Sequence, residues 1–243
     1  MYTVVPDLID AARYQEFLDE ARSILAPHAE SSARAEFGEV ALSMSALCHK
    51  LPEQYLAAMR VIGKLASLHA VLKHDSVETY LKKKCAFDII TMCGQPVLHV
   101  SGKPVCVENF DADVAWHQDW PNTGGSKNSI VLWLPLGGCD PKEGGLTLAE
   151  GETFPLLDYI IDSKVCRIRD SIADDLVAKY EAPPWGSGIF FDQFHPHCSS
   201  SGSNVRLAVS FRYEDAGCRD WRRRGFEYLH QRSKVSREFA EWQ

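Results

Sequence analysis

The sequence predicts a mainly β protein with helical support (α+β), whose short strands form a sandwich, a jelly roll or a barrel. Two observations carry this prediction. Over residues 1–85 apolar side chains recur at helical spacing, and from residue 86 onward short β-rich runs alternate with glycine-rich turns. A chain of 243 residues with 45% hydrophobic content is long enough to bury one substantial core, so we expect a single domain over 1–243.

Each element follows from its own pattern. Apolar residues three or four positions apart predict helices over 7–25, 53–74 and 77–84. Strands are predicted over 88–93, 96–101, 114–119, 130–136, 146–149, 187–192 and 205–213. These strands place the β-core over 86–215, with a charged, more helical insertion over 156–184 near its mouth. The segment 216–243, rich in arginine and aromatic residues, is expected to form a C-terminal helical tail.

Bulk properties exclude several classes of protein. A net charge of −7 argues against a surface that binds nucleic acid. The N-terminus lacks the basic and apolar regions of a signal peptide, and no stretch approaches the roughly 20 apolar residues of a membrane span. The eight cysteines are scattered without a CxxC pair, which is typical of free thiols. We therefore expect a cytoplasmic protein that binds neither membrane nor nucleic acid.

The sharpest chemical motif is the run from Trp116 to Trp120, with the sequence WHQDW. Residues i and i+2 of a strand face the same side, so His117 and Asp119 would project together while Gln118 faces the other way. An imidazole and a carboxylate placed in this way suit neighbouring positions on a metal. The pair alone is weak evidence, because a surface His–Asp pair is commonly just a solvated hydrogen bond.

Two further features strengthen the motif. A third ligand is available in a later β-rich run, from either His195 or His197. Two histidines and one carboxylate form the facial triad of non-haem Fe(II) oxygenases, which leaves coordination positions open. Arg206 begins an apolar, alternating strand, where a buried guanidinium is costly unless it meets an anion. A dicarboxylate that chelates iron and reaches Arg206 would satisfy both demands, and a salt bridge at the rim is the alternative for Arg206.

These residues resemble the phytanoyl-CoA dioxygenase family of Fe(II)/2-oxoglutarate-dependent oxygenases, over roughly residues 113–215. The resemblance lies in three blocks: WHQDW, GSKNSIVLWLPL with CDPKEGGLTLAEG, and FFDQFHPHCSSSGSNVRLAVSFRY. It implies a double-stranded β-helix core, which is a cupin-like jelly roll. It also implies Fe(II), 2-oxoglutarate and O2 as cofactor and cosubstrates. The implied reaction hydroxylates a substrate C–H bond and converts 2-oxoglutarate to succinate and CO2.

The resemblance also implies site residues. It favours His117, Asp119 and His197 as metal ligands, with His195 beside the site, and Pro196 independently restricts the backbone of His195. It places Arg206 and Ser199 on 2-oxoglutarate. Further candidates for contact with the cosubstrate are Gln118, Trp133, Asn128 and Thr147.

The substrate is expected to be a small polar molecule, such as a carbohydrate or a secondary metabolite. The polar residues expected near the mouth are Lys103, Asn122, Lys127, Asn128 and Arg212. Two alternatives remain open at this point. One is an iron enzyme of the same fold that performs epimerisation, cyclisation or desaturation, and the other is a jelly-roll module that binds a metal or a sugar without redox chemistry.

Overall fold

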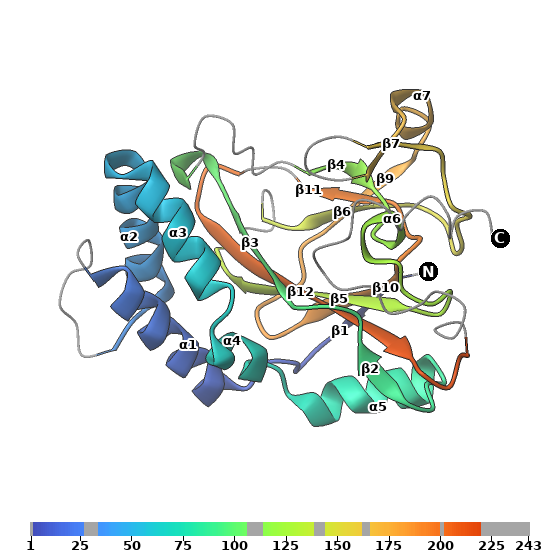
Figure 1. Cartoon of the computed structure of the whole chain (residues 1–243), viewed down its shortest axis with the longest axis horizontal. Coiled ribbons are helices and arrows are strands. Elements are labelled where there is room, and N and C mark those ends of the chain that lie inside the picture. The colour runs from blue at the N-terminus through green and yellow to red at the C-terminus, as the bar shows by residue number, and fades with distance from the viewer. Residues whose placement is uncertain are drawn as a thin grey trace.

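The structure is a computed structural model, and it describes residues 2–26, 34–105, 114–138, 144–161, 166–199 and 202–219. Two antiparallel six-stranded sheets face each other, and the N-terminal helices cover the outer side of the larger sheet (Figure 1). Apolar side chains from both sheets meet between them, including Trp133 and Phe191 from the larger sheet and Leu148 from the smaller. The predicted jelly-roll core with helical support is confirmed.

The larger sheet follows the order β1-β10-β5-β12-β2, and β3 also pairs with β12. Its strands are β1 (Tyr2–Val5), β2 (Ile90–Met92), β3 (Val97–Ser101), β5 (Ile130–Gly137), β10 (Gly188–Asp192) and β12 (Arg206–Asp215). The smaller sheet follows the order β7-β8-β4-β11-β6-β9. Its strands are β4 (Val114–His117), β6 (Leu146–Ala149), β7 (Tyr159–Ile161), β8 (Cys166–Ile168), β9 (Ala178–Glu181) and β11 (His197–Ser199). All seven predicted strands are present.

Strand β12 shows how the pattern of the sequence separates the two faces of the larger sheet. Leu207, Val209 and Phe211 belong to the core shared with the helices. Ala208 belongs to the core between the sheets. Because side chains alternate along a strand, the even-numbered residues of β12 all point toward the smaller sheet. The residues that point toward the smaller sheet include Arg206, Ser210 and Arg212.

The helical layer consists of α1 (Ala11–Ile24), α2 (Phe37–Lys50), α3 (Pro52–Ile62), α4 (Ala66–Ala70) and α5 (His74–Lys84). The helix expected over 53–74 is divided into α3 and α4, because α3 ends at Gly63. Helix α2 was not predicted, although Val40, Met44 and Leu47 form a buried stripe along it. Its start is fixed by a capping box between Glu36 and Glu39.

The segment 156–184 differs from the expected helical insertion. Its described residues, 156–161 and 166–184, contain three strands and one short helix, α7 (Asp170–Ala173). Strands β7 and β8 extend one edge of the smaller sheet through β4, and β9 extends the other edge through β6. These strands depend on partners distant in sequence, so local pattern could not reveal them. The predicted C-terminal tail lies outside the described residues from position 220 onward.

Within the described part of the chain, no helix is both long and apolar enough to cross a bilayer. The six cysteines described there are free thiols. The run Lys82–Lys84 occupies the last turn of α5, where cations complement the helix dipole.

Candidate metal centre

The smaller sheet brings the two predicted histidine ligands together. His117 ends β4 and His197 begins β11, and the two residues are direct cross-strand partners. Partners in an antiparallel pair share one side of the sheet, and the imidazole centroids lie 4.1 Å apart. The predicted strand over 114–119 ends two residues early, and Asp119 instead begins the short helix α6 (Trp120–Thr123) with φ −72° and ψ −30°. The carboxylate nevertheless reaches the histidines.

Three donor atoms converge at this point. Oδ1 of Asp119 lies 3.6 Å from Nε2 of His117 and 4.0 Å from Nε2 of His197. All three side chains are buried, and one ligand atom from each lies within 4.8 Å of the others. Two imidazole nitrogens and one carboxylate oxygen are the donor set of the facial triad. The residues present therefore fit a divalent iron ion.

Hydrogen bonds prepare both histidines for this role. Nδ1 of His117 donates to the carbonyl of Ala115 at 2.9 Å, and Nδ1 of His197 donates to the carbonyl of His195 at 3.0 Å. A carbonyl can only accept, so the proton is on Nδ1 and the lone pair of each Nε2 points to the cluster. Burial lowers the pKa of both histidines, that of His197 to about 3. Both imidazoles are therefore neutral, as metal ligation requires.

The carboxylate of Asp119 is held by an arginine on β12. Nε and Nη2 of Arg212 donate to Oδ2 at 2.9 and 2.8 Å. Burial opposes ionisation, but the charge and the hydrogen bonds of Arg212 outweigh it and lower the pKa of Asp119 to about 2. The sequence led us to expect Arg212 near the substrate mouth, whereas the structure places it against the carboxylate of Asp119.

Arg206, the predicted 2-oxoglutarate ligand, is 3% exposed. Its Nη1 donates to the carbonyls of Gly145 and Gly144 at 2.7 and 3.2 Å, and its guanidinium carbon lies 5.8 Å from the centre of the Trp133 ring. Ser101 is its direct cross-strand partner on β3. The Ser101 hydroxyl is buried and has no hydrogen-bond partner among the described residues. A buried cation beside an unsatisfied hydroxyl fits one carboxylate of a dicarboxylate ligand.

His99 is a site residue that sequence reasoning missed. It pairs with Ala208 on the inner face, and its Nε2 lies 2.8 Å from the hydroxyl of Ser210. Burial, followed by the charges of Arg212 and Arg206, lowers the pKa of His99 to about 3. The signal was present in the alternation of β3, where polar His99 and Ser101 interleave with apolar residues that face the helices.

The buried side chain of Gln118 is engaged with backbone groups, although the strand from which its direction was predicted ends at His117. Its side-chain nitrogen donates to the carbonyls of Pro155, at 2.8 Å, and Phe194, and its oxygen accepts from the amide of Leu157 at 2.9 Å. The side chain thus joins the loop after β6 to the turn before β11. These contacts indicate that Gln118 stabilises the backbone segments next to the site.

His195 and Ser199 flank His197 without joining the cluster of donors. His195 is fully buried, its Nε2 lies 3.0 Å from the carbonyl of Ala149, and its ring meets Tyr2 and Phe154 edge-on. Ser199 is half-buried, two residues along β11 from His197. Of the two histidines open from sequence, His197 is the one that the structure brings to His117 and Asp119.

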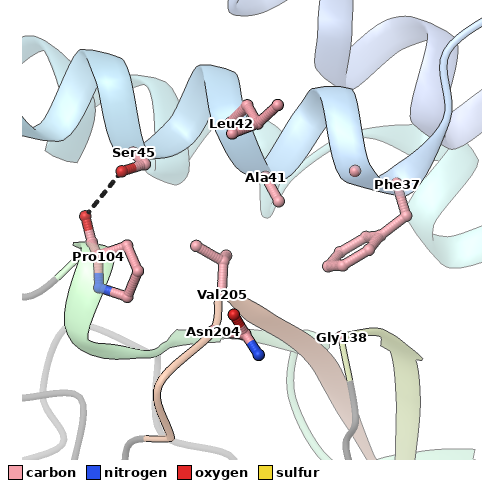
Figure 2. Close-up of a pocket in the computed structure, with 9 residues that line it drawn as sticks. Phe37, Ala41, Leu42, Ser45, Pro104, Gly138, Asn204 and Val205 are labelled. Carbon is pink, nitrogen blue, oxygen red and sulfur yellow. Dashed lines mark hydrogen bonds between the residues drawn. The ribbon is translucent and has the colours of Figure 1, made fainter.

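A separate pocket of about 600 Å³ lies between α2 and the ends of the larger sheet (Figure 2). Phe37, Ala41 and Leu42 line it from the helix, and Ser45 donates a hydrogen bond to the carbonyl of Pro104 at its side. The described residues that line it include no titratable side chain. The pocket therefore lacks groups for acid–base or metal chemistry, unlike the cluster between the sheets.

No protein-family model matches the chain, and no curated protein matches it by sequence. Solved structures do match. The epimerase SnoN, in complex with Fe3+, alpha ketoglutarate and nogalamycin RO, has a TM-score of 0.52 and 19% identity over 88% of this chain and 79% of its own. The non-heme monooxygenase ThoJ, in its Ni complex, has a TM-score of 0.50 and 14% identity over 88% of this chain and 73% of its own. At these identities the similarity shows the fold, and the chain has the jelly-roll fold of these non-heme enzymes.

Proposed function

We propose that the protein is an Fe(II)- and 2-oxoglutarate-dependent oxygenase. The observation that carries the proposal is the buried convergence of His117, Asp119 and His197, with both Nε2 atoms and one carboxylate oxygen directed at a common point. Iron bound there would supply oxygen activation coupled to conversion of 2-oxoglutarate to succinate and CO2. A module that only binds a sugar has no need for neutral histidines fixed in this tautomer beside a buried carboxylate.

The inner face of β12 supports 2-oxoglutarate as the cosubstrate. Arg206 would hold one of its carboxylates, with the Ser101 hydroxyl beside it and Trp133 flanking the guanidinium. Ser199 is half-buried beside the metal ligand His197 and is the further candidate for this contact. A guanidinium is suited to this task because its planar fork matches a carboxylate. The alpha ketoglutarate complex of the similarly folded SnoN is consistent with this assignment.

The reaction we propose is hydroxylation of a C–H bond in a small polar metabolite or natural product. A second outcome, epimerisation, cyclisation or desaturation, is favoured by one observation: the structure of SnoN, which is named an epimerase, is similar to this chain. The two outcomes differ in mass, because only hydroxylation adds an oxygen atom to the product. Mass spectrometry of the product therefore separates them.

The test measures succinate rather than a particular product. Purified protein is loaded with Fe(II) without oxygen, and then receives O2, ascorbate and 2-oxoglutarate with a panel of polar metabolites. We expect succinate above the background of metal-free protein, and the Asp119→Ala variant should remain at that background because it lacks the carboxylate ligand. Equal succinate from the native protein, the variant and the metal-free sample would overturn the proposal.

A further inference from the structure

Strand β12 carries a second arginine on the same inner face as Arg206. Arg206 and Arg212 are six residues apart, and residues at even separations point to the same side of a strand. Their Cα atoms are separated along the strand by about 20 Å, so the two side chains serve different parts of the interior. Arg206 lies beside Trp133 and Ser101, whereas Arg212 contacts Asp119.

The two carboxylate oxygens of Asp119 have different partners. Oδ2 accepts hydrogen bonds from two nitrogens of Arg212, at 2.9 and 2.8 Å. Oδ1 faces the Nε2 atoms of His117 and His197, at 3.6 and 4.0 Å. Because two adjacent nitrogens of the guanidinium converge on Oδ2, they fix the position of this oxygen. Turning Oδ2 toward the metal position would break both bonds.

Arg212 is itself held firmly in place. Its side chain is 11% exposed, and its carbonyl accepts a hydrogen bond from the amide of Cys93 at 2.8 Å. The next inward carboxylate on β12, Glu214, accepts hydrogen bonds from the amide and the hydroxyl of Ser126. The neighbouring hydroxyl on the inner face, Ser210, is engaged with His99. Both polar neighbours of Arg212 on this face thus have partners of their own, while its guanidinium contacts Asp119.

We propose that Arg212 is a positioning residue that keeps Asp119 bound to the metal through Oδ1 alone. The inference rests on the proposed function. An octahedral ion held by His117, Asp119 and His197 would keep three open positions, and a chelating 2-oxoglutarate together with O2 would need all of them. A carboxylate that bound through both oxygens would occupy one of these positions. Arg212 removes that competition by engaging Oδ2.

The experiment compares Arg212→Met and Arg212→Lys with the native protein. Arg169→Met is the matched control, because Arg169 forms an exposed ion pair with Asp158. Calorimetry gives the Kd of Mn(II), and then the Kd of 2-oxoglutarate for the Mn(II)-loaded protein. Infrared spectra of protein with labelled aspartate carboxylates give the separation between the asymmetric and symmetric stretching bands, which is smaller when both oxygens bind a metal. None of these readouts needs turnover.

In Arg212→Met we expect the Kd of 2-oxoglutarate to rise at least about tenfold, because two charge-assisted hydrogen bonds no longer hold Oδ2. The Kd of Mn(II) should stay within about threefold or decrease, because a cation near the metal is removed. The separation between the asymmetric and symmetric stretching bands of the aspartate carboxylates should become smaller, because both oxygens of Asp119 can then bind the metal. Arg212→Lys should raise the Kd of 2-oxoglutarate by about three- to tenfold, because an ammonium group keeps the charge without the planar fork. The control should match the native protein.

Two results would overturn the inference. One is a Kd for 2-oxoglutarate within about twofold of native in both variants, with an unchanged infrared separation. The other is a loss of Mn(II) affinity as large as the loss of 2-oxoglutarate affinity, which would mean that Arg212 supports only the fold of the site. If Arg212→Met does not fold, Arg212→Lys decides by the same criteria. Native protein that binds Mn(II) without binding 2-oxoglutarate would refute the proposed function instead, and the infrared comparison would still test Arg212.

Discussion

Replacing Arg206 with methionine separates binding of the cosubstrate from binding of the metal. Arg206 lies on the larger sheet and is 3% exposed, while the three proposed metal ligands come from the smaller sheet and the start of α6. Methionine keeps much of the volume of the side chain and removes its charge and all its hydrogen-bond donors. The change should therefore weaken 2-oxoglutarate binding while leaving the triad intact.

The size of the effect follows from the environment of Arg206. Each charge-assisted hydrogen bond in a buried site contributes about 1.5–3 kcal/mol, so losing two bonds to a carboxylate costs at least about 3 kcal/mol, or roughly 150-fold in Kd. The variant also leaves the carbonyls of Gly144 and Gly145 without the Nη1 donor. This should lower the free energy of unfolding by about 1–3 kcal/mol. Arg206→Lys keeps the charge and should lose only about tenfold in affinity.

The assay is calorimetry of 2-oxoglutarate binding to Mn(II)-loaded protein, with the Kd of Mn(II) measured first in each variant. Arg169→Met serves as the control for loss of an arginine at the surface. The role proposed for Arg206 is refuted if native protein binds 2-oxoglutarate and the Kd of Arg206→Met for it lies within about threefold of the native value. It is also refuted if the Kd of Mn(II) rises as much as the Kd of 2-oxoglutarate.

Three further predictions concern the surroundings of the site. His197→Ala should weaken Mn(II) binding more than about 100-fold, whereas His195→Ala, whose imidazole is engaged with a backbone carbonyl, should change it less than about threefold by calorimetry. Gln118→Leu should lower the free energy of urea unfolding by about 2–4 kcal/mol, because it removes three hydrogen bonds of a buried side chain; a loss below about 1 kcal/mol would contradict this. Metal-free protein should lose stability as pH falls below 6.5, because His99 and His197 take up protons in the unfolded state at about that pH but in the folded state only at about 3. Between these two pH values each histidine changes the free energy of unfolding by about 1.4 kcal/mol per pH unit. The free energy of urea unfolding of His99→Gln should therefore depend less steeply on pH than that of the native protein. An unchanged slope would count against the burial of that imidazole.

The local sequence pattern was sufficient to predict the elements whose apolar side chains pack on one face. The alternation of apolar and polar residues is visible in the sequence of β12, and the HxD spacing together with the later histidines pointed to the three donors that the structure brings together. The end of β4 at His117 was not predicted. Asp119 turns into α6 with helical backbone angles, and that turn depends on contacts with the rest of the site.

What could not be predicted depends on pairing between distant segments. Strand β9 forms because it lies beside β6, and β1 forms because it lies beside β10; neither has a strong pattern of its own. The roles of Arg212 and His99 were hidden for the same reason. Arg212 lies 93 residues from Asp119 in sequence, and only the antiparallel packing of the two sheets brings the guanidinium to the carboxylate.

The most direct test of the account adds 2-oxoglutarate without oxygen to protein loaded with Fe(II) and records visible absorption. Chelation of iron by the 2-oxo acid produces a metal-to-ligand charge-transfer band, which requires two adjacent open positions on the ion. We expect the band to appear in the native protein, to saturate at one equivalent of 2-oxoglutarate for each iron, and to be absent from Asp119→Ala. Iron bound stoichiometrically by His117, Asp119 and His197, with no such band at any concentration of 2-oxoglutarate, would contradict the account.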